Sequence, residues 1–387
     1  MVPAGPLWET QWAYGGGTGN ASYAYFGGGY DTPTYSTVDR IDYSNDTATA
    51  SSKGSLSSAT NRLGATGSTS YGYFGGGRSH GTKIDRVDYS SDTGTAVEKG
   101  SLNTGRYRHG AVGNNSYGYF GGGNSPSYST QSTIDRVDFS NDTATAAEKG
   151  PLSSSIFNIV DGTGNSNFGY LAPGGNSLIH RIDYSNDTAT AGVKGPLSRS
   201  ASKVGATGNA SFGYFAGGGP GSDEKTTVDR LDYSSDTTTA VEKGPLSSAR
   251  HYLSATGDTS YGYFAGGWYS EPAIRSIVDR VDYSNDTPTA SPKGPLSLAR
   301  HGLAATGNAS YGYWGGGMIN PGTTYSTVDR LDYSSDTTTA APKGPLSVAR
   351  RGLAATGNTS YGYFAGGTST PGPGKSTVDR IDFSNDT

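Results

Sequence analysis

The residues best suited to chemistry in this 387-residue chain are five histidines, a recurring Asp–Arg pair and a set of acidic turns. The histidines are His80, His109, His180, His251 and His301, and none has a metal-ligand spacing such as His-x-x-x-His. The chain has no cysteine, which excludes disulfides, thiolate metal sites and cysteine nucleophiles. Neither a nucleophile elbow nor a phosphate loop at a helix start is present. We therefore expect no catalytic site, no metal and no other cofactor.

The acidic turns have the sequence Asp-Tyr-Ser-Asn-Asp-Thr, as at Asp42–Thr47. Asp42, Ser44 and Asp46 stand at alternate positions, as in the first half of a calcium-binding loop. The glycine that turns such a loop back is missing from nearly every copy, and no later glutamate completes the ligand set. The same residue types form Asx-turns between strands. The sequence therefore favours simple turns, with calcium binding as the minor alternative.

The Asp–Arg pair occurs in seven copies, from Asp39–Arg40 onwards, and His180–Arg181 is the exception. A ring of such pairs could bind an anion. However, the same placement in almost every copy argues for salt bridges that join one repeat to the next. We therefore assign a structural role to these pairs, of which the last two are formed by Asp329, Arg330, Asp379 and Arg380.

The pairs mark a repeat that organises the whole chain, and its clearest copy is Lys293–Thr337. Eight copies at a period near fifty indicate a repeat architecture, in which each unit buries its faces against its neighbours. The arginine of the repeat recurs as Arg40, Arg86, Arg136, Arg181, Arg230, Arg280, Arg330 and Arg380.

Four short strands are predicted within one unit. Pro342 and Lys343 follow the last of them and suit an exposed edge strand. No window has a 3.6-residue apolar period, so helix should be nearly absent. Four strands per unit, eight times over, predict an all-β fold: an eight-bladed β-propeller of four-stranded antiparallel blades, forming one domain over residues 1–387. The predicted strands are Arg300–Ala305, Ser310–Trp314, Thr327–Tyr333 and Thr337–Ala341, with a loop at Met318–Ser326.

The two ends of the chain are offset within the repeat. Pro3–Asn20 matches Pro342–Asn358 with one additional residue, whereas the C-terminus stops at DRIDFSNDT. We therefore expect the N-terminal strand to complete the last blade and to close the ring.

The order of segments in one unit resembles the kelch repeat. PLSLAR followed by HGLAATG resembles the kelch arginine and its small inner strand. SYGYWGG resembles the aromatic kelch strand that ends in a double glycine. TVDRLDYSSDT resembles the kelch strand that leads into a turn. The resemblance covers the whole chain and implies a β-propeller. The Trp that usually follows the turn is replaced by Ala48, Thr238 and Thr338.

The arginine of the PLSxAR segment is not universal, because Thr60, Ile156 and Ala201 replace it in three copies. The uniform YGYFGGG and DYSNDT segments are also similar in style to repeat-rich propeller proteins of marine bacteriophages. That resemblance implies an extracellular or virion-associated location.

Charge and hydropathy limit the classes of partner. The net charge is −4, 16% of the residues are charged, and no basic stripe is present, so we expect no nucleic-acid partner. No apolar run approaches the ~18 residues of a membrane span, so we expect no membrane insertion. The N-terminus, MVPAGPLWETQW, shows no secretory signal pattern.

The loop between the second and third strands differs in every copy, while the framework is nearly invariant. Strand alternation places these loops on one face, together with the connections from the fourth strand to the next first strand. Aromatic side chains beside arginine are typical of binding surfaces, although such loops also drift where nothing constrains them. The predicted ligand-binding residues are Trp268, Tyr269, Tyr30, Tyr128, Met318, Tyr325, Arg250, His251, Arg300, His301, Arg350 and Arg351.

The favoured hypothesis is non-catalytic recognition of a host cell-surface glycan or protein through this face, as in a phage tail protein or surface adhesin. Aromatic rings would stack on the apolar faces of sugars. One alternative is a purely structural component of a virion or extracellular matrix that associates with its own copies or with other surface proteins. A polysaccharide-acting enzyme is the third hypothesis.

Overall fold

The computed structural model describes residues 16–20, 22–29, 34–42, 51–155, 159–164, 167–173, 177–194, 196–201, 203–219, 223–235, 239–269, 273–319, 322–357, 360–369 and 378–386. This part of the chain is all-β: it has strands, one short 3-10 helix (η1, Tyr333–Ser335) and no α-helix. None of its helices is therefore long and apolar enough to cross a membrane.

Seven four-stranded sheets and one three-stranded sheet follow one another along the described chain, and all their strand pairs are antiparallel. The first four sheets are β1 (Gly16–Gly19), β2 (Tyr23–Gly27), β3 (Val38–Asp42) and β4 (Ser51–Lys53); β5 (Gly64–Gly67), β6 (Tyr71–Gly75), β7 (Ile84–Asp88) and β8 (Val97–Glu98); β9 (Gly110–Gly113), β10 (Tyr117–Gly121), β11 (Ile134–Asp138) and β12 (Ala147–Lys149); and β13 (Ile159–Gly164), β14 (Phe168–Pro173), β15 (His180–Asp183) and β16 (Gly192–Val193). The next three are β17 (Gly205–Gly208), β18 (Phe212–Ala216), β19 (Val228–Asp232) and β20 (Val241–Lys243); β21 (Ser254–Gly257), β22 (Tyr261–Ala265), β25 (Val278–Asp282) and β26 (Ser291–Pro292); and β27 (Ala304–Gly307), β28 (Tyr311–Gly315), β31 (Val328–Asp332) and β32 (Ala341–Lys343). The three-stranded sheet is β33 (Ala354–Gly357), β34 (Tyr361–Ala365) and β35 (Val378–Asp382), and two small hairpins are β23 (Trp268–Tyr269) with β24 (Ala273–Ile274) and β29 (Met318–Ile319) with β30 (Thr323–Thr324).

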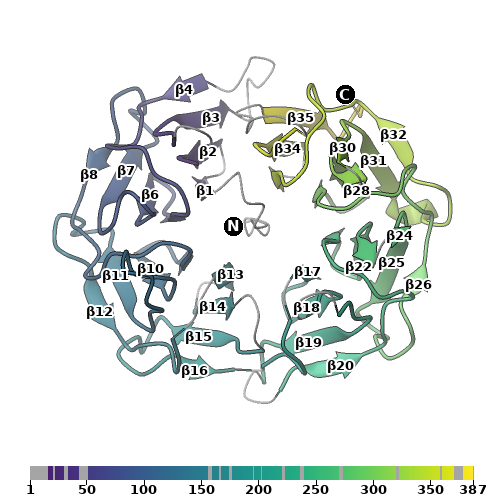
Figure 1. Cartoon of the computed structure of the whole chain (residues 1–387), viewed down its shortest axis with the longest axis horizontal. Coiled ribbons are helices and arrows are strands. Elements are labelled where there is room, and N and C mark those ends of the chain that lie inside the picture. Colours follow the sequence, from purple (N-terminus) through teal and green to yellow (C-terminus); the bar gives the residue numbers. More distant parts are fainter. Residues whose placement is uncertain are drawn as a thin grey trace.

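The sheets follow one another in a circle in chain order, with the first strand of each sheet innermost and, in the four-stranded sheets, the fourth outermost (Figure 1). This is a propeller-like architecture. The predicted all-β class and the four-stranded antiparallel sheets are therefore confirmed.

Two of the predicted strands are displaced along the repeat. The first strand, expected over 300–305, is β27 (Ala304–Gly307), because Gly302 has a left-handed backbone with φ +65° that interrupts an extended chain. The fourth strand, expected over 337–341, is β32, so Pro342 and Lys343 lie within the edge strand instead of after it. The loop 318–326 contains the hairpin formed by β29 and β30.

The acidic turn and the segment expected as the fourth strand instead join neighbouring repeats. The Gly294 N–H donates to the Asp336 carbonyl at 2.7 Å, and the Ala340 N–H donates to the Pro295 carbonyl at 2.8 Å. These hydrogen bonds hold the acidic turn of one sheet against the end of the preceding sheet.

The hydrophobic core lies between sheets. One cluster combines Ala304, Tyr313 and Val328 with Leu353 and Phe364 of the next sheet. Aromatic rings also stack across this boundary, since the centroids of Tyr313 and Phe383 are 4.8 Å apart. Each sheet therefore buries its face against its neighbour, as expected of a repeat protein.

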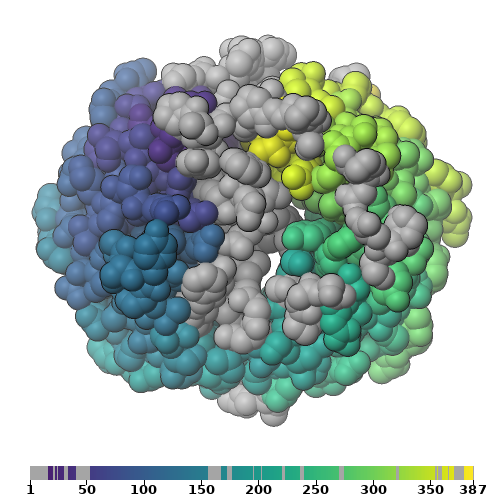
Figure 2. Space-filling model, in the orientation of Figure 1, coloured from purple at the N-terminus to yellow at the C-terminus, as the bar shows by residue number. Residues whose placement is uncertain are grey.

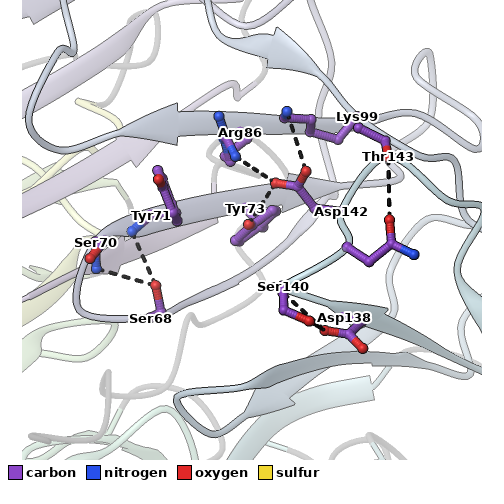
Figure 3. Close-up of polar contacts among 11 residues, drawn as sticks. Ser68, Ser70, Tyr71, Tyr73, Arg86, Lys99, Asp138, Ser140, Asp142 and Thr143 are labelled. Atoms are coloured by element: carbon purple, nitrogen blue, oxygen red, sulfur yellow. Dashed lines mark hydrogen bonds and ion pairs between the residues drawn. The ribbon is translucent and has the colours of Figure 1, made fainter.

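The second aspartate of the acidic turn is bound by three side chains of the preceding sheet, an arrangement that we call the aspartate clasp. At Asp142, the Tyr73 hydroxyl and Arg86 Nη1 each donate to Oδ2 at 2.8 Å, and Lys99 Nζ lies 3.2 Å from Oδ1 (Figure 3). The other described clasps are at Asp92, Asp187, Asp286, Asp336 and Asp386.

The first aspartate of the turn has a separate role. Asp332 Oδ1 accepts hydrogen bonds from the Ser334 N–H at 2.9 Å and from the Ser334 hydroxyl at 2.7 Å, which is an Asx-turn. The two carboxylates of one acidic turn thus bind different partners, one within the turn and one in the clasp. Within the described ranges, no group of three or more His, Cys, Asp or Glu side chains is placed to hold a metal ion.

Candidate functional site

Strand register places the variable loops and the fourth-to-first connections at the same end of each sheet. Ala304, which begins the first strand, pairs with Gly315 at the end of the second, and Gly315 pairs with Val328 at the start of the third. Val328 in turn pairs with Lys343 at the end of the fourth strand. The connection before Ala304, the loop after Gly315 and the chain after Lys343 therefore meet on one side, which we call the loop face.

The richest cluster on the loop face comes from two neighbouring sheets. Trp268 in β23 packs edge-on against His251, with 4.7 Å between ring centroids, and lies 6.3 Å from the His301 ring. Tyr252 completes the group, at 4.8 Å from His251 and 5.9 Å from His301. We call Trp268, Tyr252, His251 and His301 the aromatic cluster.

The backbone fixes the position of Trp268. Gly266 and Gly267 have φ of +66° and +114° and turn the chain out of β22. His251 and Trp268 then exchange two backbone hydrogen bonds, of 2.9 and 2.8 Å. The indole is half-buried, and its Nε1 atom is buried with no hydrogen-bond partner among the described residues. A half-buried indole whose position is fixed by its backbone is a suitable platform for a stacked ligand.

Tyr269 extends this cluster outwards. Its side chain is 38% exposed, and the Arg275 guanidinium lies over its ring at 5.6 Å. The hairpin between β23 and β24 brings the two residues together. The pair combines a partly exposed aromatic ring with a half-buried guanidinium.

The electrostatics of the cluster keep His251 neutral. Burial and the positive charge of Lys203 lower the pKa of His251 to about 4, although Glu224 opposes this shift. The Glu224 carboxylate lies 3.2 Å from His251 Nδ1. His251 is therefore an uncharged packing partner of Trp268 at neutral pH.

A second exposed aromatic stands elsewhere on the loop face. Tyr128 is 66% exposed, has a left-handed backbone with φ +66°, and accepts a hydrogen bond from Arg78 Nη2 at 3.0 Å through its hydroxyl. Tyr107 packs edge-on against it at 6.2 Å. A large side chain at this strained backbone position is a candidate contact residue.

Three of the predicted binding arginines are not on the surface. Arg250, Arg300 and Arg350 are fully buried, and each pairs with the aspartate of its own third strand. The Arg250 Nη1–Asp279 Oδ2 distance is 2.8 Å, and the Arg300 Nη1–Asp329 Oδ2 distance is 2.9 Å. Because their guanidinium groups are buried in these ion pairs, the three arginines cannot contact a ligand at the surface. The expectation that they lie on the binding surface is therefore wrong.

The remaining predicted binding residues are only partly accessible. His301 and Met318 are buried, and their backbones bridge each other. Tyr325 and Arg351 are half-buried, and the Tyr325 N–H donates to the Gly317 carbonyl at 2.9 Å. Tyr30 lies outside the described residues.

The Asp–Arg pairs, given a structural role from sequence, do not bind each other. Asp329 pairs with Arg300, while the neighbouring Arg330 reaches Asp386 of the next sheet and also lies over the Tyr311 ring at 4.4 Å. Asp379 pairs with Arg350 in the same way. The Arg380 guanidinium lies over the ring of Tyr361 at 4.7 Å.

Sequence reasoning missed several members of the site. Tyr252 and Arg275 were not singled out. The available signal was that Tyr252 stands where other copies have Gly302 and Gly352. Aligning the repeats shows that tyrosine replaces glycine at this position, but it does not show the backbone conformation there.

Comparison with models of known protein families gives no match for this chain, and no curated protein is significantly similar to it in sequence.

Proposed function

We propose that this chain is a non-catalytic recognition module whose loop face binds a glycan on a cell surface. The observation that carries the proposal is the aromatic cluster around Trp268, extended to solvent by Tyr269 and Arg275. Most described aromatic side chains of the repeated framework pack between sheets, whereas Trp268 and Tyr269 lie in a loop that no other copy shares.

The mechanism follows from the residue types. The apolar face of a pyranose ring stacks on the indole of Trp268 or the phenol of Tyr269. The Arg275 guanidinium then donates to sugar hydroxyl or carboxylate oxygens. His251 and His301 support the indole from behind, so that little conformational freedom is lost on binding.

The finer architecture is part of the same proposal: an eight-bladed, kelch-like propeller closed by its N-terminal segment, placed on a cell or virion exterior. The eightfold repeat supports the blade count, and the last described sheet has three strands where seven others have four. In Figure 1 the last sheet comes round to the first. A rigid closed ring suits loops that must hold a fixed binding geometry.

A glycan array with the purified protein tests the function. We expect Trp268→Ala/Tyr269→Ala to lose at least tenfold in affinity for the glycans that the parent binds, because stacked aromatic anchors dominate such sites. The matched control is Val97→Ala/Val241→Ala, which removes two exposed side chains from the outer strands β8 and β20 and should leave binding unchanged.

Other outcomes would replace the proposal. Equal binding by the parent and by Trp268→Ala/Tyr269→Ala would remove the aromatic cluster as the site. Assembly of the protein into fibres, with no glycan bound, would favour a structural component. Release of reducing ends from a polysaccharide would favour an enzyme.

A further inference from the structure

The loop between β10 and β11 carries an exposed tyrosine that lies far from the aromatic cluster, since β10 and β22 stand on opposite sides of the circle in Figure 1. Tyr128 is 66% exposed, more than any other large hydrophobic side chain of the described residues. Its backbone is left-handed, with φ +66°, a conformation that favours glycine and strains a residue with a Cβ. The sequence thus keeps a large ring at a position where the backbone favours glycine and where most of the ring meets solvent. In Figure 2, blue-teal atoms from this part of the chain are in full view at the surface, over the sheet of β9–β12.

Two neighbours fix the ring of Tyr128. Arg78 Nη2 donates to the Tyr128 hydroxyl at 3.0 Å, and the ring of the buried Tyr107 lies edge-on at 6.2 Å. Tyr107 is anchored in turn, because it exchanges two backbone hydrogen bonds of 2.9 Å with Asn124. These contacts hold the Tyr128 ring without covering it, so it can stack on a ligand with little loss of conformational freedom.

Arg78 comes from the variable loop of the preceding sheet, between β6 and β7, and is exposed. Its backbone N–H donates to the Asn61 carbonyl at 2.9 Å, which fixes the start of that loop. Among the described residues, the Tyr128 hydroxyl is the hydrogen-bond acceptor of its guanidinium, and no carboxylate forms an ion pair with it. A guanidinium has five N–H donors, so Arg78 keeps donors for a ligand.

The charges around Arg78 favour an anion. Neither residues 78–83 nor residues 124–133 contain an aspartate or a glutamate. The third-strand aspartates of the same two sheets, Asp85 and Asp135, are fully buried. The aromatic cluster differs, because the Glu224 carboxylate lies against it. An anionic ligand is therefore attracted to Arg78 more than to the aromatic cluster.

Hydroxyl groups stand beside Tyr128 in the same loop. Ser125 Oγ lies 2.8 Å from Ser127 Oγ and 2.6 Å from Ser129 Oγ, and both Ser127 and Ser129 are exposed. Each hydroxyl can donate one hydrogen bond and accept two, so the exposed pair keeps capacity for further partners. An aromatic ring, a guanidinium and hydroxyls together match a sugar with a charged substituent.

We propose that Tyr128 and Arg78 form a second subsite of the loop face, and that this subsite binds a sugar bearing a carboxylate group. The sugar ring stacks on Tyr128, and the carboxylate accepts paired hydrogen bonds from Arg78. Ser127 and Ser129 bind hydroxyl groups of the same sugar. This ligand class deepens the proposed recognition function and rests on it.

Oligogalacturonate and its methyl ester test the subsite, because they share the sugar rings and differ in the charge of the carboxyl groups. We expect the parent to bind the acid about tenfold more tightly than the ester in calorimetric titrations. Arg78→Gln should abolish this preference and leave the affinity for the ester unchanged. Tyr128→Gly should weaken the binding of both probes, because the stacked ring is lost. Its melting temperature should not fall, since the backbone at this position favours glycine.

A matched control separates a built subsite from general attraction. Lys83→Gln removes one positive charge from the same loop as Arg78→Gln, but from an exposed ion pair with Glu98 at 2.8 Å. Its preference for the acid should stay within about twofold of that of the parent, since such pairs contribute little. Equal losses of preference in Lys83→Gln and Arg78→Gln would overturn the subsite, as would full affinity in Tyr128→Gly. Equal affinity of the parent for acid and ester, or no binding of either, would overturn the ligand class.

The aromatic variant distinguishes this inference from the function on which it rests. If neutral glycans bind through Trp268 but the parent shows no preference for the acid, the recognition function stands and the second subsite is wrong. If Trp268→Ala/Tyr269→Ala keeps its affinity for every neutral glycan while Arg78→Gln loses the preference for the acid, the second subsite stands and the aromatic site is wrong.

Discussion

The buried aspartate of the third strand has a basic partner in several sheets, but the base is not always the same. Arg106 pairs with Asp135 at 3.0 Å, as the equivalent arginines do in three later sheets. In the sheet of β5–β8, Thr60 replaces this arginine, and His80 Nε2 lies 3.3 Å from Asp85 instead. A buried carboxylate without a partner costs several kcal/mol of stability, about 3–5 in measured cases, which explains the substitute.

This pairing makes a rescue experiment possible. His80→Ala should destabilise the protein by about 2–4 kcal/mol, because buried Asp85 loses the His80 ring and keeps the Ser57 N–H, at 2.9 Å, as a donor. Adding Thr60→Arg supplies the guanidinium that the other sheets use, and should recover most of that loss. Thermal unfolding of the single and double variants measures both effects. A double variant no more stable than His80→Ala would contradict the equivalence of the two bases.

The aspartate clasp predicts that the two aspartates of one acidic turn contribute differently to the stability of the protein. Asp336→Asn weakens the bonds to Arg280, Lys293 and Tyr263 of the preceding sheet and should cost about 2–3 kcal/mol. Asp332→Asn keeps an oxygen that accepts from Ser334, so it should cost less than about 0.5 kcal/mol. Denaturant unfolding compares them, and equal costs would mean that the clasp adds nothing to the turn.

At the scale of the element, the connection between sheets depends on the glycine that follows the fourth strand. A Cβ at Gly294 would lie 1.4 Å from the Thr338 carbonyl oxygen of the next sheet. Gly294→Ala should therefore cost more than about 3 kcal/mol or prevent folding, since the backbone itself must move. Gly94 has open space around its Cβ position, so Gly94→Ala should leave the melting temperature unchanged. A neutral Gly294→Ala would contradict the close approach.

The elements also show what the sequence could and could not predict. The second and third strands lie within one residue of their expected places, because their alternating pattern reports a buried strand directly. The fourth strand was displaced because its Thr-rich segment resembles a strand but hydrogen bonds to the preceding repeat. The sequence predicts Arg300 and its equivalents at the surface, because no local sequence pattern distinguishes a buried, paired arginine from an exposed one. Of the aromatic cluster, Trp268, His251 and His301 could be predicted from the sequence, but Tyr252 could not.

At the scale of the whole molecule, the proposed closure of the ring by the N-terminal segment can be tested by deletion. Removing residues 1–7 should lower the melting temperature by several degrees, because the last sheet would keep an open edge. If the ring is closed in this way, the repeat pattern predicts a further aspartate clasp between Arg380 and Asp46, which lies outside the described residues. Asp46→Asn should then cost about as much as Asp336→Asn. Full stability of the deletion variant would argue against closure.

The clasps also predict acid lability. Burial alone would raise the pKa of Asp142, but hydrogen bonds from Tyr73 and Lys99 and the charge of Arg86 outweigh it and lower that pKa; Asp386 is lowered in the same way. The stability that these groups contribute is therefore fully present above the unfolded-state pKa of about 3.9, and is lost as the pH falls through the lower folded-state values. Melting temperatures should drop steeply below about pH 4, and less steeply for Asp142→Asn. A flat profile between pH 7 and 2.5 would contradict this.

The most direct test of the account is a hydrogen-exchange footprint of the bound protein. The central claim is that the repeated residues build the ring and that the loop face alone recognises the ligand. With the glycan that binds most strongly on the array, we predict slower amide exchange in segments 251–253 and 268–269 and no change in the turns 306–310 and 333–336 of the opposite face. Protection confined to those turns, with unchanged exchange on the loop face, would contradict the claim.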